Sequence, residues 1–207
     1  LLFPIFSRLI KERTSIKPLL DSASRLLFAF ALVAATACFF YPSEILGLIY
    51  TGNIELAVPT FQWIMISFLP VCMIMIFGTL LTANGSMRTL NWLSLFGLVI
   101  NVILNLFFIQ KWGAWGASLA TLITQGALAF FQLYFVYKYF EITLKIKQVL
   151  RYSGFIAWLI LSGYLLNEYQ PGSFNLSFFL ASALFSVFLF GMIEWRVLPG
   201  LLKKSDQ

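Results

Sequence analysis

Residues 101–125 read NVILNLFFIQKWGAWGASLATLITQ, an apolar helix followed by an abrupt break and a second helix. The first helix carries Asn101 and Asn105, and both amides point the same way because residues three or four apart share a helix face. The break falls at Lys-Trp-Gly, residues 111–113, and the apolar pattern resumes at once. We interpret this stretch as a tight helical hairpin that crosses a bilayer twice.

Small residues gather on one side of the second helix of this hairpin. Glycine and alanine at helical spacing let two helix backbones approach closely inside a membrane. We therefore predict that packing in the hairpin depends on four small residues, namely Gly113, Gly116, Ala117 and Ala120.

The composition of the whole chain is typical of a membrane protein. Of 207 residues, 60% are hydrophobic and 11% are charged, whereas soluble domains have about 25% charged residues. A membrane-spanning helix needs about 20 apolar residues, with a range of about 17–25. Uncharged runs near or above this length occupy residues 26–43, 56–87, 89–110, 112–137, 152–167 and 169–193. The sequence therefore predicts an all-α integral membrane protein with six transmembrane helices.

Basic residues set the predicted orientation of these spans. Successive loops alternate between the two sides of the membrane, and thirteen of the fourteen lysines and arginines fall on one side, with Lys111 on the other. Cytoplasmic loops carry such an excess of basic residues. We therefore expect both termini of this segment in the cytoplasm. The net charge of +6 then reflects topology rather than nucleic-acid binding.

Charge and turn residues divide the chain into three parts. Residues 1–24 include Pro4 and mix apolar and basic residues at helical spacing, which predicts a cytoplasmic amphipathic segment at the membrane surface. Residues 25–140 hold the first four spans. Residues 141–207 begin with a basic loop and hold two additional transmembrane helices and a cytoplasmic tail.

The third span carries a stripe of polar side chains. They follow a three-and-four spacing, namely Asn91, Ser94, Asn101 and Asn105. Amides are costly against lipid, so the stripe should face other helices or water. Two interpretations stay open, hydrogen bonding between helices and the lining of a substrate path. The fourth span adds Thr121 and Gln125 as candidates for such a path.

A proline interrupts the second span. Pro70 lies deep within the uncharged run 56–87. A proline inside a helix removes one backbone hydrogen bond and kinks the helix. The kink is either the hinge of a transporter or a static packing bend, and the sequence leaves both possibilities open.

Residues suited to catalysis and metal binding are scarce. The chain has no histidine, which excludes His-ligated zinc and Ser-His-Asp chemistry within it. Cys38 and Cys72 fall inside predicted spans, where we expect small apolar fillers rather than a disulfide. Nothing resembles a paired acid and base, a metal cluster or a glycine loop that cradles phosphate. We therefore expect no enzyme, no cofactor and no bound metal.

Residues 78–125, GTLLTANGSMRTLNWLSLFGLVINVILNLFFIQKWGAWGASLATLITQ, resemble the C-terminal lobe of polysaccharide (O-antigen) flippases in the multidrug/oligosaccharidyl-lipid/polysaccharide exporter superfamily. The resemblance rests on a small-residue turn before Arg88, on the two asparagines, and on Gly-Ala-Ser-Leu-Ala-Thr at 116–121. The opening FPIFSRL, residues 3–9, is similar to the family's cytoplasmic segment before its ninth helix. Family members usually have proline where this chain has Gln110, which affects the turn and not the fold.

The resemblance implies that the chain corresponds to helices nine to fourteen of a fourteen-helix flippase, one transporter lobe plus two appended helices. The chain begins at Leu1 rather than methionine, so we expect a fragment whose partner is the missing N-terminal lobe of the same protein. Such proteins look built to move polyprenyl-diphosphate-linked glycans across the cell inner membrane by alternating access. Membrane lipids are the other expected partners.

The functional alternatives differ in the residues they need. Basic residues near the cavity mouth, such as Arg25, Arg88 or Lys111, would attract the diphosphate, or they only determine topology. A cation-coupled multidrug antiporter of the same superfamily usually needs a mid-span carboxylate, which this chain lacks. A membrane enzyme of polysaccharide assembly would be expected to have a large charged periplasmic loop. A purely structural membrane subunit is the remaining alternative.

Overall fold

The computed structural model describes residues 2–52, 54–141, 146–169 and 175–192, which form helices joined by short turns and contain no β-strand. The all-helical prediction is thus confirmed for this part of the chain. Its elements in chain order are α1 (Leu2–Lys11), α2 (Lys17–Phe40), α3 (Pro42–Gly47), α4 (Val58–Ala83), α5 (Met87–Phe140), α6 (Ile146–Tyr169) and α7 (Asn175–Leu189).

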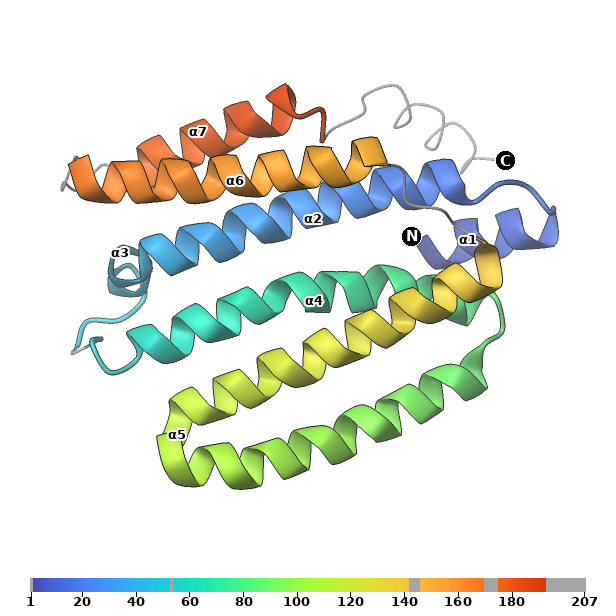
Figure 1. Cartoon of the computed structure of the whole chain (residues 1–207), viewed down its shortest axis with the longest axis horizontal. Coiled ribbons are helices and arrows are strands. Elements are labelled where there is room, and N and C mark those ends of the chain that lie inside the picture. Colours follow the sequence, from blue (N-terminus) through green and yellow to red (C-terminus); the bar gives the residue numbers. More distant parts are fainter. Residues whose placement is uncertain (1, 53, 142–145, 170–174, 193–207) are drawn as a thin grey trace.

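Helix α5 is a hairpin rather than one straight rod (Figure 1). Gly113 has φ 57° and ψ −132°, a conformation open to glycine and strained for residues with a Cβ. The helical hydrogen bonding continues on both sides, so the first arm, 87–112, turns back into the second arm, 114–140. The turn predicted at 111–113 therefore lies at its glycine.

Four helices, α2, α4, α5 and α6, are long and apolar enough to cross a membrane. At about 1.5 Å per residue, each arm of α5 alone exceeds a hydrocarbon core of about 30 Å. The sixth predicted span falls on α7, whose 15 described residues are a shorter apolar helix. The membrane-protein class is supported, and the count of six spans stays a prediction.

Helix α2 begins earlier than the uncharged run suggested, at Lys17 rather than near residue 25. Pro18 occupies the first turn, where its missing N–H costs nothing. Leu19 and Leu20 follow and are buried, so their contacts extend the helix past Asp21 toward its amino end. Charged residues in the first turns of a span can reach the polar interface, which is why a charge-free run underestimates the helix.

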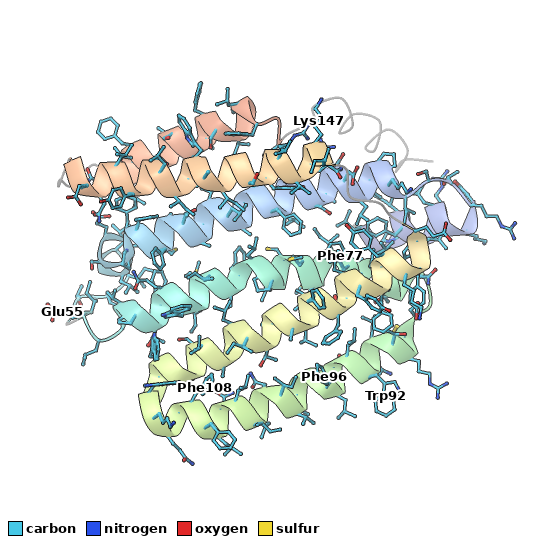
Figure 2. All side chains as sticks on the ribbon, in the orientation of Figure 1. Glu55, Phe77, Trp92, Phe96, Phe108 and Lys147 are labelled. Atoms are coloured by element: carbon cyan, nitrogen blue, oxygen red, sulfur yellow. The ribbon has the colours of Figure 1, made fainter. Side chains whose placement is uncertain are left out.

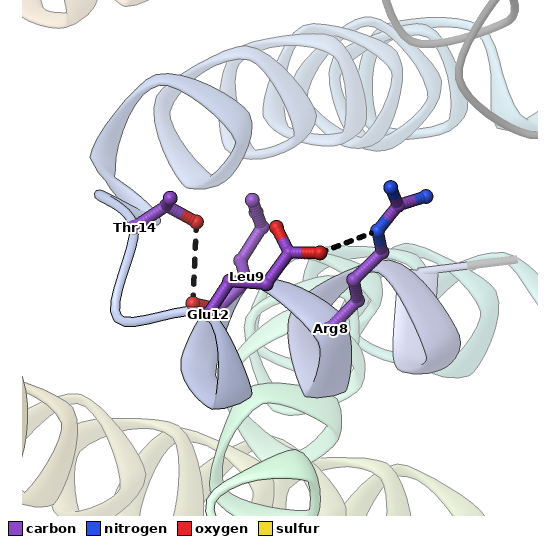
Figure 3. Close-up of polar contacts among 4 residues, drawn as sticks. All are labelled: Arg8, Leu9, Glu12 and Thr14. Carbon is purple, nitrogen blue, oxygen red and sulfur yellow. Dashed lines mark hydrogen bonds and ion pairs between the residues drawn. The ribbon is translucent and has the colours of Figure 1, made fainter.

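The amphipathic helix α1 packs against the bundle. Phe6 is fully buried among residues of α2, α4 and α5. On the polar side, the Arg8 Nε donates to Glu12 Oε1 over 2.8 Å, and the Thr14 hydroxyl donates to the Leu9 carbonyl over 3.2 Å at the end of the helix (Figure 3). The apolar face of this segment, which the sequence predicted to lie at the membrane surface, thus packs against protein.

Two apolar cores meet at α2. One joins α1, α2, α4 and the end of α5, with Ile76, Leu80 and Leu81 at its centre. The other joins α2 to α6 and α7 through Phe155, Leu159 and other buried residues. The order across the molecule is therefore α7 and α6, then α2, then α4, then the two arms of α5 (Figure 1).

The helix connections alternate between the two ends of the bundle. The α4–α5 turn, the start of α2 and the start of α6 lie at one end, and the bend of α5 lies at the other (Figure 1). Lys147 and Glu55 mark these opposite ends (Figure 2). The first end, which also holds α1 and both termini of α5, is called the basic end below because Arg88, Lys138 and Lys147 belong to it.

Candidate functional site

The asparagine pair of the third predicted span lies inside the α5 hairpin. Asn101 Nδ2 donates to Thr124 Oγ1 of the second arm over 3.4 Å, a long hydrogen bond. Asn105 Nδ2 donates to the Asn101 Oδ1 and to the Asn101 backbone carbonyl, each over 2.9 Å. Thr124 in turn donates to the Ala120 carbonyl over 2.8 Å. We call Asn101, Asn105 and Thr124 the amide cluster, and it links the two arms.

The two arms approach most closely near the bend. A Cβ added at Gly116 would lie 2.2 Å from the Phe108 carbonyl oxygen. This distance is too short for a Cβ atom, so no side chain fits here without a shift of the backbone. Ala120, one turn further, is fully buried, whereas Ala117 is half-buried and Gly113 is exposed at the bend itself. Among the four small residues, Gly116 is thus the one whose missing side chain sets the distance between the arms.

The polar stripe of the first arm divides into two parts. Asn101 and Asn105 are half-buried in the hairpin, whereas Asn91 and Ser94 are exposed. The contact face between the arms runs through Leu93 and Gly97, which are buried. The polar stripe therefore lies at the edge of this contact face, and it diverges from the face toward the basic end. Asn91 is one turn from the start of α5, where an amide can reach the polar interface.

Polar residues of the second arm lie in different surroundings. The Thr121 hydroxyl donates to the Ala117 carbonyl over 2.9 Å. Gln125 is half-buried and has no hydrogen-bond partner in the described part of the chain. Gln132, which the sequence did not single out as a site residue, is 7% exposed and packs against Gly78 of α4. Its Oε1 is buried without a hydrogen-bond partner among the described residues.

A groove with an aromatic lining lies between the arms of α5 at the basic end. Its volume is about 490 Å³, and it is lined by Arg88, Thr89, Trp92, Phe96, Phe131 and Phe135. Phe96 and Phe131 meet edge to face with ring centroids 5.4 Å apart. Thr89 and Tyr139 share a hydrogen bond of 3.2 Å beside it. We call this feature the aromatic groove, and Figure 2 labels two of its residues, Trp92 and Phe96.

The guanidinium of Arg88 is the charged group of the aromatic groove. Arg88 is exposed and forms no ion pair with a described residue. A guanidinium presents five N–H donors in a planar fork that matches phosphate oxygens. A cation at the mouth of an apolar, aromatic trough suits an amphiphile with an anionic head and a hydrocarbon tail.

The hinge candidate Pro70 is buried within α4, and the helix continues through it from Val58 to Ala83. At the opposite end of the bundle, burial raises the pKa of the Glu44 carboxyl. Burial and the neighbouring Glu44 also raise the pKa of the Tyr41 hydroxyl. In the described residues no His, Cys, Asp and Glu side chains cluster in a way that could hold a metal ion.

Comparisons of the chain with known protein families, with characterised proteins and with solved structures find no match. The residues and geometry of this chain are therefore the basis for a functional assignment.

Proposed function

We propose that this chain is part of a flippase that moves a polyprenyl-diphosphate-linked oligosaccharide or polysaccharide precursor across the cytoplasmic membrane. The observation that carries the proposal is Arg88 beside the aromatic groove. A lipid-linked glycan has a diphosphate that a guanidinium binds and a long hydrocarbon tail that suits an apolar groove. With the basic end in the cytoplasm, as the positive-inside rule expects, Arg88 meets the substrate in the leaflet where it is made.

The remaining features take supporting roles in this proposal. The chain forms the C-terminal lobe of a transporter of the multidrug/oligosaccharidyl-lipid/polysaccharide type, with α6 and α7 appended. Alternating access then means that this lobe rocks against an N-terminal lobe supplied by the same protein, about a site near the midplane. Pro70 is the candidate hinge within the lobe. Gln125 lacks a hydrogen-bond partner in the described part of the chain and is the candidate to meet sugar hydroxyls.

The hydrogen bonds of the amide cluster favour packing over substrate contact for Asn101 and Asn105. Each side chain already uses its donors or acceptors within the hairpin. Asn91, exposed near the basic end, keeps its amide available to a ligand. The substrate path proposed here therefore begins at Arg88 and Asn91 rather than deep between the arms.

Surface polysaccharide in cells that depend on the full-length protein tests the proposal. Arg88→Ala should lower the amount of polysaccharide at unchanged protein level, and Arg88→Lys should keep part of it because the charge remains without the planar fork. Lys138→Ala is the matched control, since Lys138 is an exposed cation at the same end of the same hairpin.

Two outcomes count against the proposal. Equal loss in Arg88→Ala and Lys138→Ala means that both residues act only through topology. Full polysaccharide in Arg88→Ala, combined with lost resistance to cationic drugs, favours the antiporter of the same superfamily instead.

A further inference from the structure

A second cavity lies at the junction between the two apolar cores. It has a volume of about 480 Å³, is partly open, and is lined by residues of α2, α4, the second arm of α5 and α6. Its walls are mainly apolar and include Phe28, Leu32, Leu69, Met73 and Leu133. We call it the junction cavity. Helices α4 and α5 pack against each other and are called the α4–α5 unit below. The cavity separates this unit from α6, and both α4 and α6 pack on α2.

The junction cavity is polar at one end only. There Gln148 Nε2 of α6 donates to Asp21 Oδ2 of α2 over 3.1 Å. Tyr152 also lines this end, and the charges of Arg25 and Arg151 as well as Asp21 act on its hydroxyl. The Asp21 carboxylate therefore lies at the mouth, and Arg25 and Arg151 follow in the adjoining turns of α2 and α6. Asp21 Oδ2 accepts this hydrogen bond, and a carboxylate can accept several hydrogen bonds at once.

The depth of the cavity matches one leaflet of a bilayer. Its lining runs along α2 from Leu20 to Leu32, and this stretch of helix rises about 18 Å. Half of a hydrocarbon core of about 30 Å is about 15 Å. The polar mouth belongs to the first turns of α2 and α6, at the basic end, where headgroups would lie. The apolar end reaches Leu69, beside Pro70 near the middle of α4.

We propose that the junction cavity binds one bilayer phospholipid with an amine-bearing headgroup, phosphatidylethanolamine, from the leaflet at the basic end. One acyl chain fills the apolar depth and completes the contact between α6 and the α4–α5 unit. The headgroup ammonium pairs with Asp21, and its phosphate meets the guanidiniums of Arg25 and Arg151. A purely anionic headgroup would place its charge beside the Asp21 carboxylate without an amine to pair with it.

This lipid is a resident of the fold and is independent of the proposed transport function. The aromatic groove lies between the arms of α5, whereas the junction cavity lies between α2, α4, the second arm of α5 and α6. The two sites share no lining residue. Loss of one can therefore be separated from loss of the other.

Photo-crosslinking in nanodiscs tests the site. The full-length protein is reconstituted with phosphatidylethanolamine and phosphatidylglycerol, together with a trace of phosphatidylethanolamine that carries a diazirine in the middle of an acyl chain. Peptide mapping should find several-fold more adducts on the cavity wall at Met73 and Leu133 than at Leu106, which is 60% exposed on the first arm of α5. Equal yields at the wall and at Leu106 would overturn the proposal.

Variants separate the tail from the headgroup. Met73→Trp should remove the wall adducts at Leu133, whereas Leu106→Trp should leave them unchanged. Asp21→Asn keeps the shape of the side chain and should reduce adducts from the phosphatidylethanolamine probe about tenfold, as expected for one lost charge-assisted hydrogen bond. A phosphatidylglycerol probe should not lose adducts in this variant. Unchanged phosphatidylethanolamine labelling in both Met73→Trp and Asp21→Asn, or its displacement by a polyprenyl diphosphate, would contradict a resident phospholipid.

Discussion

Asn101 and Thr124 hold the two arms of α5 together from positions 23 residues apart, with the Asn101 Nδ2 3.4 Å from the Thr124 Oγ1. Asn105 supports this contact from the next turn by donating to the Asn101 Oδ1. A pair of amides that looks like the lining of a polar path is thus occupied by partners inside the hairpin. The charge at Arg88, beside the aromatic groove, lies between three and four helical turns from Asn101.

We expect Asn101→Leu to act on stability before it acts on transport. The substitution removes the contact with Thr124, and hydrogen bonds between membrane helices contribute about 0.6 kcal/mol on average and about 1.7 at most. Unfolding of the purified protein in detergent measures this change. Asn91→Leu, at an exposed position of the same arm, is the control and should leave stability unchanged. A fully stable but inactive Asn101→Leu protein would instead place Asn101 in the substrate path.

Gly116 should be the small residue of the hairpin that least tolerates a side chain. A Cβ there meets the Phe108 carbonyl at 2.2 Å, and a backbone atom cannot move aside as a flexible side chain can. We expect Gly116→Ala to lower the free energy of unfolding by about 1–3 kcal/mol. Gly126→Ala is the control because a Cβ at Gly126 meets no atom within 4 Å. Equal thermal stability of the two variants would show that the arms are further apart than described.

The orientation of the bundle can be measured with single cysteines. In a background with Cys38 and Cys72 replaced by alanine, Glu55→Cys and Asn84→Cys place one exposed thiol at each end. The excess of basic residues predicts that an impermeant thiol reagent labels the Glu55 position in intact spheroplasts and the Asn84 position only after lysis. The reverse pattern would put the basic end outside and would remove Arg88 from the cytoplasmic leaflet.

The hairpin of α5 could be predicted because its determinants are local. A glycine at the break, 113, and small residues three and four positions apart carry the information within a few residues of one another. Helix α2 was harder to delimit, because Asp21 and Arg25 interrupt the uncharged run although their turns belong to the helix. In both cases the apolar pattern located the element. The start of α2, however, could be placed only from the buried contacts of Leu19 and Leu20.

The contacts between helices could not be predicted from the same patterns. Gly97 lies against Leu128, and Gly78 lies against Gln132. The sequence shows only that a small residue stands at each position, and not which residue it contacts. The aromatic groove has the same origin, because Phe96 and Phe131 come together only once the register of the two arms is fixed. Arg88 was therefore recognisable as a candidate, whereas its aromatic surroundings were not.

The most direct test of the proposed function is translocation in liposomes. The full-length protein is reconstituted with a fluorescent polyprenyl-diphosphate oligosaccharide, and an impermeant quencher reports the fraction of label in the outer leaflet over time. We predict that wild-type protein exchanges the label between leaflets much faster than protein-free liposomes do. Arg88→Ala should be slow, Arg88→Lys intermediate and Lys138→Ala like wild type. Exchange no faster than in protein-free liposomes, or equal rates for wild type and Arg88→Ala, would contradict the assignment.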